Sequence, residues 1–182
     1  MKLVSRSFAD GDRIPPEHAL GVPGESGPVP GPNKSPHFSW SDAPPGTRSF
    51  AMICHDRDVP SKGEDVNKSD RTVPYDLPRV DFHHWVLVDI PADTTELLSD
   101  ASKSGPLPAG SFSVRSDYGA TGWGGCAPPA GDRPHRYVFA VHALDVERLG
   151  VDASATPAYV GFNLAFHTLA RGVLRGTYQI PG

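Results

Sequence analysis

Apolar and polar residues alternate along several stretches of the chain, as they do in β-strands that bury one face. The clearest stretches are RSFAMICHDRDVP at 48–60, HHWVLVDIP at 83–91 and HRYVFAVHAL at 135–144. In the first, Met52, Cys54 and Asp56 fall on one face, so a carboxylate ends a face that is otherwise apolar. A weaker strand pattern lies in the middle of residues 106–119, and a last one follows Gly172.

The three strong strands carry polar residues at their ends. The first ends with Asp56 and Asp58, whereas the second begins with His84 and the third with His135. If both histidine strands run antiparallel to the acidic one, these polar ends meet at one edge of a sheet. We therefore expect them to form a single site.

Alternation also assigns each side chain to a face. Within 83–91 it places His84 on the face of Val86, Val88 and Ile90, opposite Trp85. Aromatic side chains at such positions are usually core residues, and we expect this of Trp85 and Phe139. Trp123, in a glycine-rich loop, is a candidate for the rim of a pocket.

One helix is predicted near the C-terminus. Thr156 is a suitable N-cap and Pro157 a suitable first residue, so we expect a helix over residues 157–171. Apolar side chains then recur at helical spacing, namely Tyr159, Phe162, Phe166 and Leu169. We expect this apolar face, Phe166 included, to pack on the core.

Composition favours a turn-rich fold with few long helices. Among 182 residues there are 19 glycines and 20 prolines, and a chain of this length is typical of one domain, here residues 1–182. The turn formers of residues 10–36 predict an ordered surface segment, and the polar residues 61–81 predict a long loop. Several strands and one late helix predict a mainly antiparallel β-sandwich.

Charge and targeting signals narrow the function classes. The formal net charge is −4, with no cluster of Lys or Arg longer than a pair, which argues against binding to nucleic acid or an acidic membrane surface. No signal peptide or membrane-spanning stretch is apparent, so we expect a cytoplasmic protein. Cys54 and Cys126 are too far apart in sequence to suggest a paired zinc motif, and Cys54 lies among apolar residues as a buried thiol would.

The polar strand ends have two interpretations. Any one Asp or His at a strand end can simply satisfy the amides of a loop. Taken together, they predict a small anion site, in which histidine N–H groups and the backbone N–H groups of the loop GGCAPP at 124–129 face the ligand. The aspartates would orient the imidazoles and raise their pKa.

Four motifs in this order resemble the phosphatidylethanolamine-binding protein family, in its bacterial Raf-kinase-inhibitor-like branch. They are DRDVP, HHWVLVDIP, GGCAPPAGDRPHRYVFAVHAL and FNLAFHTLARGVLRGTY, and the resemblance extends from about Phe8 to the end of the chain. It implies a large central antiparallel sheet, a smaller sheet packed on it, a C-terminal helix and short peripheral helices. It also implies a pocket for phosphate-like and carboxylate groups.

Carried over by motif position, the resemblance implies a set of ligand-binding residues. They are Asp56, Asp58, Pro60, His84, Gly125, Ala127, Pro128, His135 and Tyr137. This chain has Arg57 and Val59 where the aspartate motif has proline and alanine, and Cys126 stands one place earlier than the cysteine of many bacterial members. The long segment from Ser61 to Asp81 is placed to cover or reshape the mouth of the pocket.

These observations lead to one main hypothesis and two alternatives. The first is a non-enzymatic binding protein for a small anionic or phosphorylated ligand, without a cofactor and without integral membrane association. The second is an inhibitor of a kinase or a protease that docks through the same pocket. The third is a metal-dependent hydrolase using the two aspartates and two histidines. An exposed sheet face and the resemblance to bacterial proteins also favour a homodimer.

Overall fold

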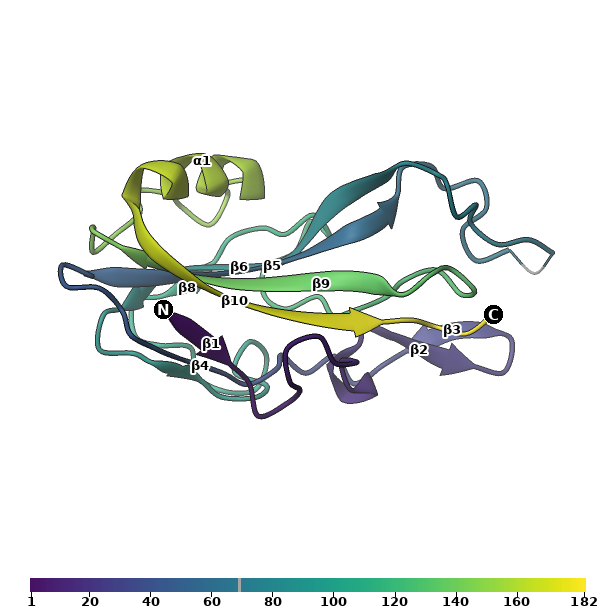
Figure 1. Ribbon diagram of the computed structural model, residues 1–182, viewed down its shortest axis with the longest axis horizontal. Coiled ribbons are helices and arrows are strands. Elements are labelled where there is room, and N and C mark those ends of the chain that lie inside the picture. Colours follow the sequence, from purple (N-terminus) through teal and green to yellow (C-terminus); the bar gives the residue numbers. More distant parts are fainter. Residues whose placement is uncertain (69) are drawn as a thin grey trace.

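The computed structural model of the protein describes residues 1–68 and 70–182, and its centre is a five-stranded antiparallel sheet. The strand order is β10–β9–β5–β6–β8, with bounds Thr168–Tyr178, His135–Leu144, Ser49–Pro60, Arg79–Pro91 and Phe112–Ser113. A smaller sheet packs on one face, in the order β1–β4–β7, with bounds Lys2–Val4, Phe38–Ser41 and Glu96–Leu97. Figure 1 shows the two layers, and the predicted sandwich is confirmed.

The main core lies between these two sheets. Strand alternation sends Phe50, Met52 and Cys54 of β5 to this side, where they are fully or almost fully buried. The ring centroids of Phe38 and Phe139 lie 5.0 Å apart across the interface. Trp85 and Phe139 are both completely buried, so the prediction that they are core residues is confirmed, as is that of a buried Cys54.

Strand β5 lies between β6 and β9 and is antiparallel to both, as expected from the polar strand ends. Asp56 is paired with Tyr137 on one side and with Phe82 on the other, so the end of β5 meets the start of β9. The three interior strands, β9, β5 and β6, each pair with a neighbour on both sides, which gives the site a rigid base. The expectation that the acidic and histidine segments meet is confirmed.

The predicted face of His84 is wrong because β6 contains a bulge. Cys54 pairs with Trp85 but His55 pairs with His83, so one extra residue of β6 lies between these pairs. The bulge turns His84 toward the main core, where its ring lies 5.2 Å from that of Tyr137. Val86 remains on the opposite face of the sheet.

Helix α1, Pro157–His167, begins where the sequence predicts but ends earlier. The side chain of Thr156 accepts a hydrogen bond from the Tyr159 N–H at 3.2 Å, which confirms the cap. The chain then enters β10 at Thr168, so the expectation of a helix to residue 171 is wrong.

The orientation of α1 is also the reverse of the expected one. Val160 and Leu164 are the residues that pack on the second face of the central sheet. The predicted apolar face is exposed instead, with exposed fractions of 51% for Tyr159, 60% for Phe162 and 69% for Phe166. The helix therefore holds the sheet with small and aliphatic side chains and leaves its aromatic ones outside.

The turn-rich segments are ordered along the surface. Residues 10–36 form a 3₁₀ turn at Pro16–His18 and a hairpin of β2, Gly21–Gly24, with β3, Gly27–Pro30. Residues 61–81 form a loop until β6 begins at Arg79, and Ser69 lies outside the described residues. In the described part of the chain, no helix is long and apolar enough to cross a membrane.

Candidate functional site

A cavity of about 220 Å³ opens near the end of β5 and the start of β9. It is lined by Asp56, Val59, Pro60, Lys62, Gly63, Val66, Phe82, His84, Tyr118, Ala127, Pro129, His135 and Tyr137. Six of the nine predicted ligand-binding residues are in this set, namely Asp56, Pro60, His84, Ala127, His135 and Tyr137. The other three, Asp58, Gly125 and Pro128, are not.

His135 lies between two carboxylates at the base of the cavity. Its Nδ1 is 2.6 Å from Oδ2 of Asp56, and its Nε2 is 3.0 Å from Oδ2 of Asp132. Burial opposes protonation of the ring, but the hydrogen bonds and charges of Asp56 and Asp132 outweigh it and raise the pKa of His135. The ring is therefore held as an imidazolium that donates from both nitrogens.

This arrangement corrects the expected role of His135. Both of its N–H groups are used within the protein, so neither faces a ligand. Instead, His135 holds the carboxylate of Asp56 in place and compensates its negative charge. The other oxygen of Asp56, Oδ1, accepts a hydrogen bond from the backbone N–H of Asp58 at 2.7 Å. The aspartates do hold the imidazole and raise its pKa, as the sequence suggested.

Asp132 in turn is held by an arginine from the start of β6. Arg79 donates Nη1–H to Oδ2 and Nη2–H to Oδ1 of Asp132, at 2.6 and 3.0 Å. Burial would raise the pKa of Asp132, but the hydrogen bonds from Arg79 and His135 lower it. The same guanidinium donates to the carbonyl of Pro74, so the base of the cavity is tied to the 61–81 loop.

His84 is held differently and has the opposite charge preference. Its Nδ1 donates to the carbonyl of Gly124 at 2.6 Å. Burial lowers the pKa of His84, although the charge of Asp56 and the Gly124 carbonyl oppose this, so the ring is neutral near pH 7. Its Nε2 is then a bare lone pair, and it is buried without a hydrogen-bond partner among the described residues.

The glycine-rich loop does not present its first amides to the cavity. The N–H of Gly124 donates to the carbonyl of His84, and that of Gly125 donates to Oδ1 of Asn33 at 2.7 Å. A Cβ on Gly125 would collide with the carbonyl oxygen of His18. The expectation that these two N–H groups face a ligand is therefore wrong, because one holds the loop to β6 and the other holds it to Asn33.

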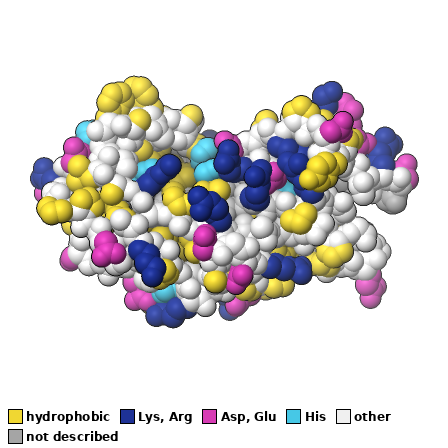
Figure 2. Space-filling model, in the orientation of Figure 1, with side chains coloured by type: hydrophobic (Ala, Val, Ile, Leu, Met, Phe, Trp, Pro, Cys, Tyr) yellow, Lys and Arg dark blue, Asp and Glu magenta, His cyan; other side chains and the backbone are white. Residues whose placement is uncertain are grey.

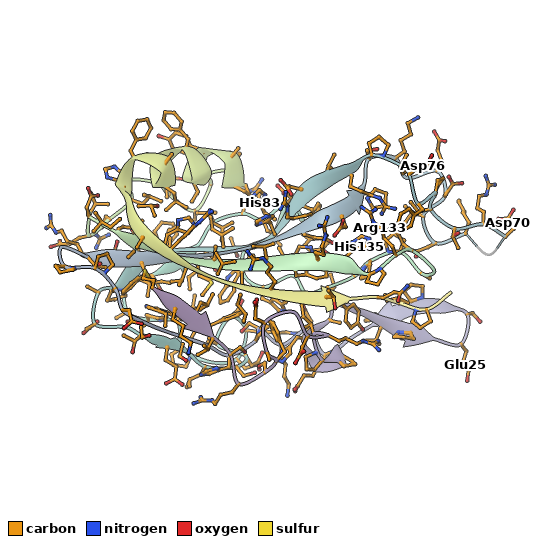
Figure 3. The ribbon with its side chains drawn as sticks, in the orientation of Figure 1. Glu25, Asp70, Asp76, His83, Arg133 and His135 are labelled. Carbon is orange, nitrogen blue, oxygen red and sulfur yellow. The ribbon has the colours of Figure 1, made fainter. Side chains whose placement is uncertain are left out.

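Asp58 supports the site from behind. Its side chain is only 2% exposed and accepts hydrogen bonds from Arg133, at 2.9 Å, and from Arg136, at 2.8 and 2.9 Å. Burial disfavours its ionised form, but these arginines outweigh burial and lower the pKa of Asp58 to about 2. Figure 3 shows Arg133 beside His135 at the base of the arm that β5 and β6 form.

Two tyrosine hydroxyls complete the polar lining. The hydroxyl of Tyr137 is buried and has no hydrogen-bond partner among the described residues, and burial raises the pKa of Tyr137 well above its usual value. Burial likewise raises the pKa of Tyr118, whose hydroxyl makes only a long 3.4 Å contact with the carbonyl of Gly125. Both groups are therefore neutral donors.

Comparisons with known proteins identify the family of the chain. The family model described as phosphatidylethanolamine-binding protein matches residues 4–179. The chain is 42% identical over 181 residues to the UPF0098 protein YbhB of Escherichia coli, covering 98% of this chain and all of that one. The chain belongs to the phosphatidylethanolamine-binding protein family.

Solved structures of family members have the same architecture. The crystal structure of E. coli YbcL, titled a new member of the mammalian PEBP family, matches with a TM-score of 0.80 and 33% identity over 98% of each chain. That of the putative phosphatidylethanolamine-binding protein homologue CT736 from Chlamydia trachomatis matches with a TM-score of 0.74 and 25% identity, over 98% and 96%. The resemblance noted from four short motifs therefore extends to the whole fold.

Sequence reasoning missed several residues that this family member uses to build the cavity. Asp132 has a detectable signal, since it lies three residues before His135 in GDRPH. Pro129 lies in the loop 124–129, which the sequence places at the pocket, whereas Tyr118 and Phe82 have no signal, because only the folded chain brings them to the cavity. Lys62, Gly63 and Val66 bear out the idea that the 61–81 segment reshapes the pocket, since all three line it.

The metal hypothesis gains no ligand set from this arrangement. Within residues 1–68 and 70–182, no three His, Cys, Asp or Glu side chains are grouped so that they could hold a metal ion. His135 has both nitrogens engaged by carboxylates, and Asp58 is held by arginines.

Cys126 is buried, with its pKa raised by burial, and does not line the cavity. Trp123, the candidate rim residue, is buried in the core with its indole N–H on the carbonyl of His18.

Proposed function

We propose that this family member is a binding protein, not an enzyme, whose cavity takes a small ligand of the phosphate or phosphate-ester type. The observation that carries this proposal is the buried Nε2 of His84, which lacks a partner on the wall of a cavity. A buried polar atom left unsatisfied costs about 1–3 kcal/mol, and a ligand that supplies its hydrogen bond recovers this. The hydroxyl of Tyr137 is in the same position.

The two unsatisfied groups match a phosphate that retains one proton. The neutral His84 ring offers a lone pair at Nε2, which accepts a P–O–H group, while the Tyr137 hydroxyl donates to an unprotonated phosphate oxygen. Proton transfer to His84 gives the equivalent pair of an imidazolium and a dianion. Lys62, also on the lining, adds a positive charge. Asp56 does not repel the ligand strongly, because His135 neutralises it.

The size and the apolar lining limit the rest of the ligand. A cavity of about 220 Å³ is at the small end for ligand sites and accommodates a headgroup but not acyl chains. Val59, Pro60, Val66, Phe82 and Pro129 surround the polar base with apolar surface. A phosphate ester with a short organic substituent fits this lining, with its phosphate at the polar base and its substituent against the apolar side chains.

Binding of such a ligand is linked to protons. In the free protein the pKa of His84 is lowered by burial, whereas a phosphate oxygen beside Nε2 raises it. The complex therefore takes up a proton, and affinity increases as pH falls from 8 toward 6. A ligand bound without contact to Nε2 of His84 would not cause this proton uptake.

Titration with phosphoethanolamine, followed by NMR of the histidine rings, tests the proposal. We expect shifts at His84 that saturate by about 10 mM, a tighter Kd at pH 6 than at pH 8, and loss of binding in His84→Ala. His167→Ala, which removes a partly exposed histidine of α1, is the matched control and leaves binding unchanged. The absence of any shift at His84 up to that concentration would refute the proposal.

Docking of a kinase or protease through the same cavity stays a prediction. If it occurs, free phosphate competes with the protein partner in a pull-down, because both need the Nε2 of His84. Retention of a partner at saturating phosphate would place its contacts elsewhere on the molecule.

A further inference from the structure

The second face of the central sheet is only half covered. Helix α1 packs on one end of it, and the arm formed by β5 and β6 rises at the other end, leaving a saddle between them (Figure 1). Figure 2 shows Lys or Arg side chains, with histidine among them, gathered over this saddle. It lies on the opposite side of the sheet from the His84 cavity, because neighbouring strand residues such as His55 and Asp56 face opposite ways.

A groove of about 340 Å³ forms the floor of this saddle. It is lined by Ile53, His55, Arg57, His83, Val138, Ala140, His142, Arg171, Val173 and Arg175, which we call the sheet-face groove. A second hollow continues it toward α1 and shares Ile53, His142 and Arg171 with it. Six of its ten lining residues are arginine or histidine, in a chain whose net charge is −4.

Two of the three arginines of this groove have no ion-pair partner for their side chains. Within the described residues, no carboxylate lies within 4.0 Å of the guanidinium group of Arg171 or Arg175, both exposed on β10, although the backbone N–H of Arg175 donates to Oδ1 of Asp10 at 2.8 Å. Arg57 has a loose partner in Asp81 at 3.8 Å. By contrast, Arg79, Arg133 and Arg136 around the other cavity are all paired. Like charges placed together without counter-charges repel one another, and an external anion removes this repulsion.

The strand register places the two arginines of β10 in separate sets, each beside a histidine. His142 lies directly opposite Arg171, whereas Arg175 shares a row with His55 through Val138. Arg171 and Arg175 are four residues apart on one strand, about 13 Å between Cα atoms, and both reach the same groove. A single small anion can contact only one of these sets at a time, whereas a ligand with several anionic groups can contact both.

We infer that the sheet-face groove is a second binding site, for a small polyanion with phosphate groups at two or more positions. The fork of an arginine guanidinium pairs with phosphate oxygens in a bidentate way, which favours phosphate over other anions. The uncharged residues Ile53, Ala140 and Val173 form the floor of the groove between the two sets. An apolar linker between the anionic groups of a ligand is therefore accommodated there. This inference does not depend on the His84 cavity.

The histidines of the groove make such binding stronger in acid. Burial and Arg171 lower the pKa of His142 to about 4, and its Nδ1 is 3.1 Å from the hydroxyl of Thr168. For His55, burial, His83 and Arg57 lower the pKa, and the carboxylates of Asp81 and Asp56 oppose them. A bound phosphate beside either ring favours its protonated form, so the complex takes up protons as the pH falls.

Isothermal titration with inorganic tripolyphosphate, with orthophosphate as the single-anion comparison, tests this inference. We expect tripolyphosphate to bind at least about tenfold more tightly than orthophosphate, and the double variant Arg171→Gln/Arg175→Gln to weaken it by about tenfold or more. Arg115→Gln/Arg148→Gln removes the same charge from exposed arginines elsewhere and leaves the affinity unchanged. His84→Ala removes orthophosphate binding in the cavity but leaves the tripolyphosphate affinity of the groove unchanged, which separates the two sites.

Four results would overturn the inference. The first is the absence of tripolyphosphate binding. The second is an equal loss of affinity in both double variants, because this would indicate non-specific electrostatic attraction. Loss of binding in His84→Ala alone places the polyanion in the cavity. A change from dimer to monomer in Arg171→Gln/Arg175→Gln, with tripolyphosphate affinity retained, identifies the groove as a contact between two copies of the chain. Because both arginines are exposed, the variants fold, and a circular dichroism melt confirms it.

Discussion

At the residue scale, two histidines of one cavity have opposite charge states because their partners differ. His135 has a carboxylate at each nitrogen, so its positive form is stabilised. His84 has a carbonyl at one nitrogen and nothing at the other, so burial keeps it neutral. The first therefore organises the cavity, and the second remains free to exchange a proton with a ligand.

Replacement of Asp132 with asparagine tests how His135 is held. The change removes one of the two carboxylates on the ring, so the pKa of His135 falls from its raised value toward or below the ordinary one. It also leaves the buried guanidinium of Arg79 unpaired, at a cost of about 3 kcal/mol in unfolding free energy. Histidine NMR signals recorded across a pH titration measure the pKa. Asp76→Asn, an exposed change in the 61–81 loop (Figure 3), is the control and leaves the pKa of His135 as it was.

Asp58 is expected to stabilise the fold and not to bind ligand. Asp58→Asn weakens its hydrogen bonds to Arg133 and Arg136 and lowers the unfolding free energy at pH 7 by about 1.5–3 kcal/mol. The pKa of Asp58 is lowered to about 2 by folding, so its contribution is present above about pH 4, the pKa of an unfolded aspartate, and is lost as pH falls through about 2. Urea unfolding at several pH values measures this. A gap between wild type and variant that does not narrow below pH 4 would contradict the assignment.

At the element scale, the orientation of α1 predicts which of its apolar residues matter. Phe166 is 69% exposed, so Phe166→Ser changes the unfolding free energy by no more than about 0.5 kcal/mol. Leu164 is 3% exposed on the sheet side, and Leu164→Ala costs about 2–5 kcal/mol. Thermal or urea unfolding of the two variants tests this orientation. The orientation expected from the sequence would instead make Phe166→Ser more destabilising than Leu164→Ala.

Two glycines give a second matched pair of substitutions. Gly125 packs against the carbonyl of His18, so Gly125→Ala forces the loop away and costs about 1–3 kcal/mol. Gly161 lies within α1 with nothing within 4 Å of an added Cβ, and Gly161→Ala stabilises the helix by about 0.5–1 kcal/mol. Opposite signs in the two melting temperatures are the expected result. If Gly125→Ala is neutral, the close approach to His18 does not constrain the loop.

The long elements could be predicted from sequence because their pattern is local. β5 and β9 alternate over many residues, and their polar ends identify Asp56 and His135 without any structure. The bulge that redirects His84 could not be predicted, because it depends on how β6 pairs with β5. Strands of two to four residues, such as β1, β4 and β7, are too short for periodicity to identify.

The same limit applies to the site. Motif position located six lining residues, but it could not separate a residue that faces the cavity from one that supports it, as Asp58 shows. Amide groups of the glycine-rich loop were expected to be free because nothing in the sequence links Gly125 to Asn33, 92 residues away. The aromatic side of α1 was assigned to the core because periodicity identifies an apolar stripe but not the surface it contacts.

At the scale of the whole molecule, the two proposed binding surfaces lie on opposite faces of one sheet. The His84 cavity is lined on its sides by the 61–81 loop and the glycine-rich loop, which come from distant parts of the chain. The sheet-face groove is made by four adjacent strands, β6, β5, β9 and β10. Because both surfaces share β5, a ligand at one is separated from the other only by the thickness of the sheet.

The histidines together predict a maximum of stability close to pH 6.5, the pKa of an unfolded histidine. His84, His55 and His142 have pKa values lowered by folding, so their contribution is present above about pH 6.5 and is lost as pH falls through their folded values. His135 has a raised pKa, so its contribution is present below about pH 6.5 and is lost as pH rises through its folded value. Melting temperatures recorded from pH 5 to pH 9 should therefore decline on both sides. We expect His142→Gln to flatten the acid side and Asp132→Asn to flatten the alkaline side, and a melting temperature that rises steadily from pH 6 to pH 9 would show that His135 is not held as a cation.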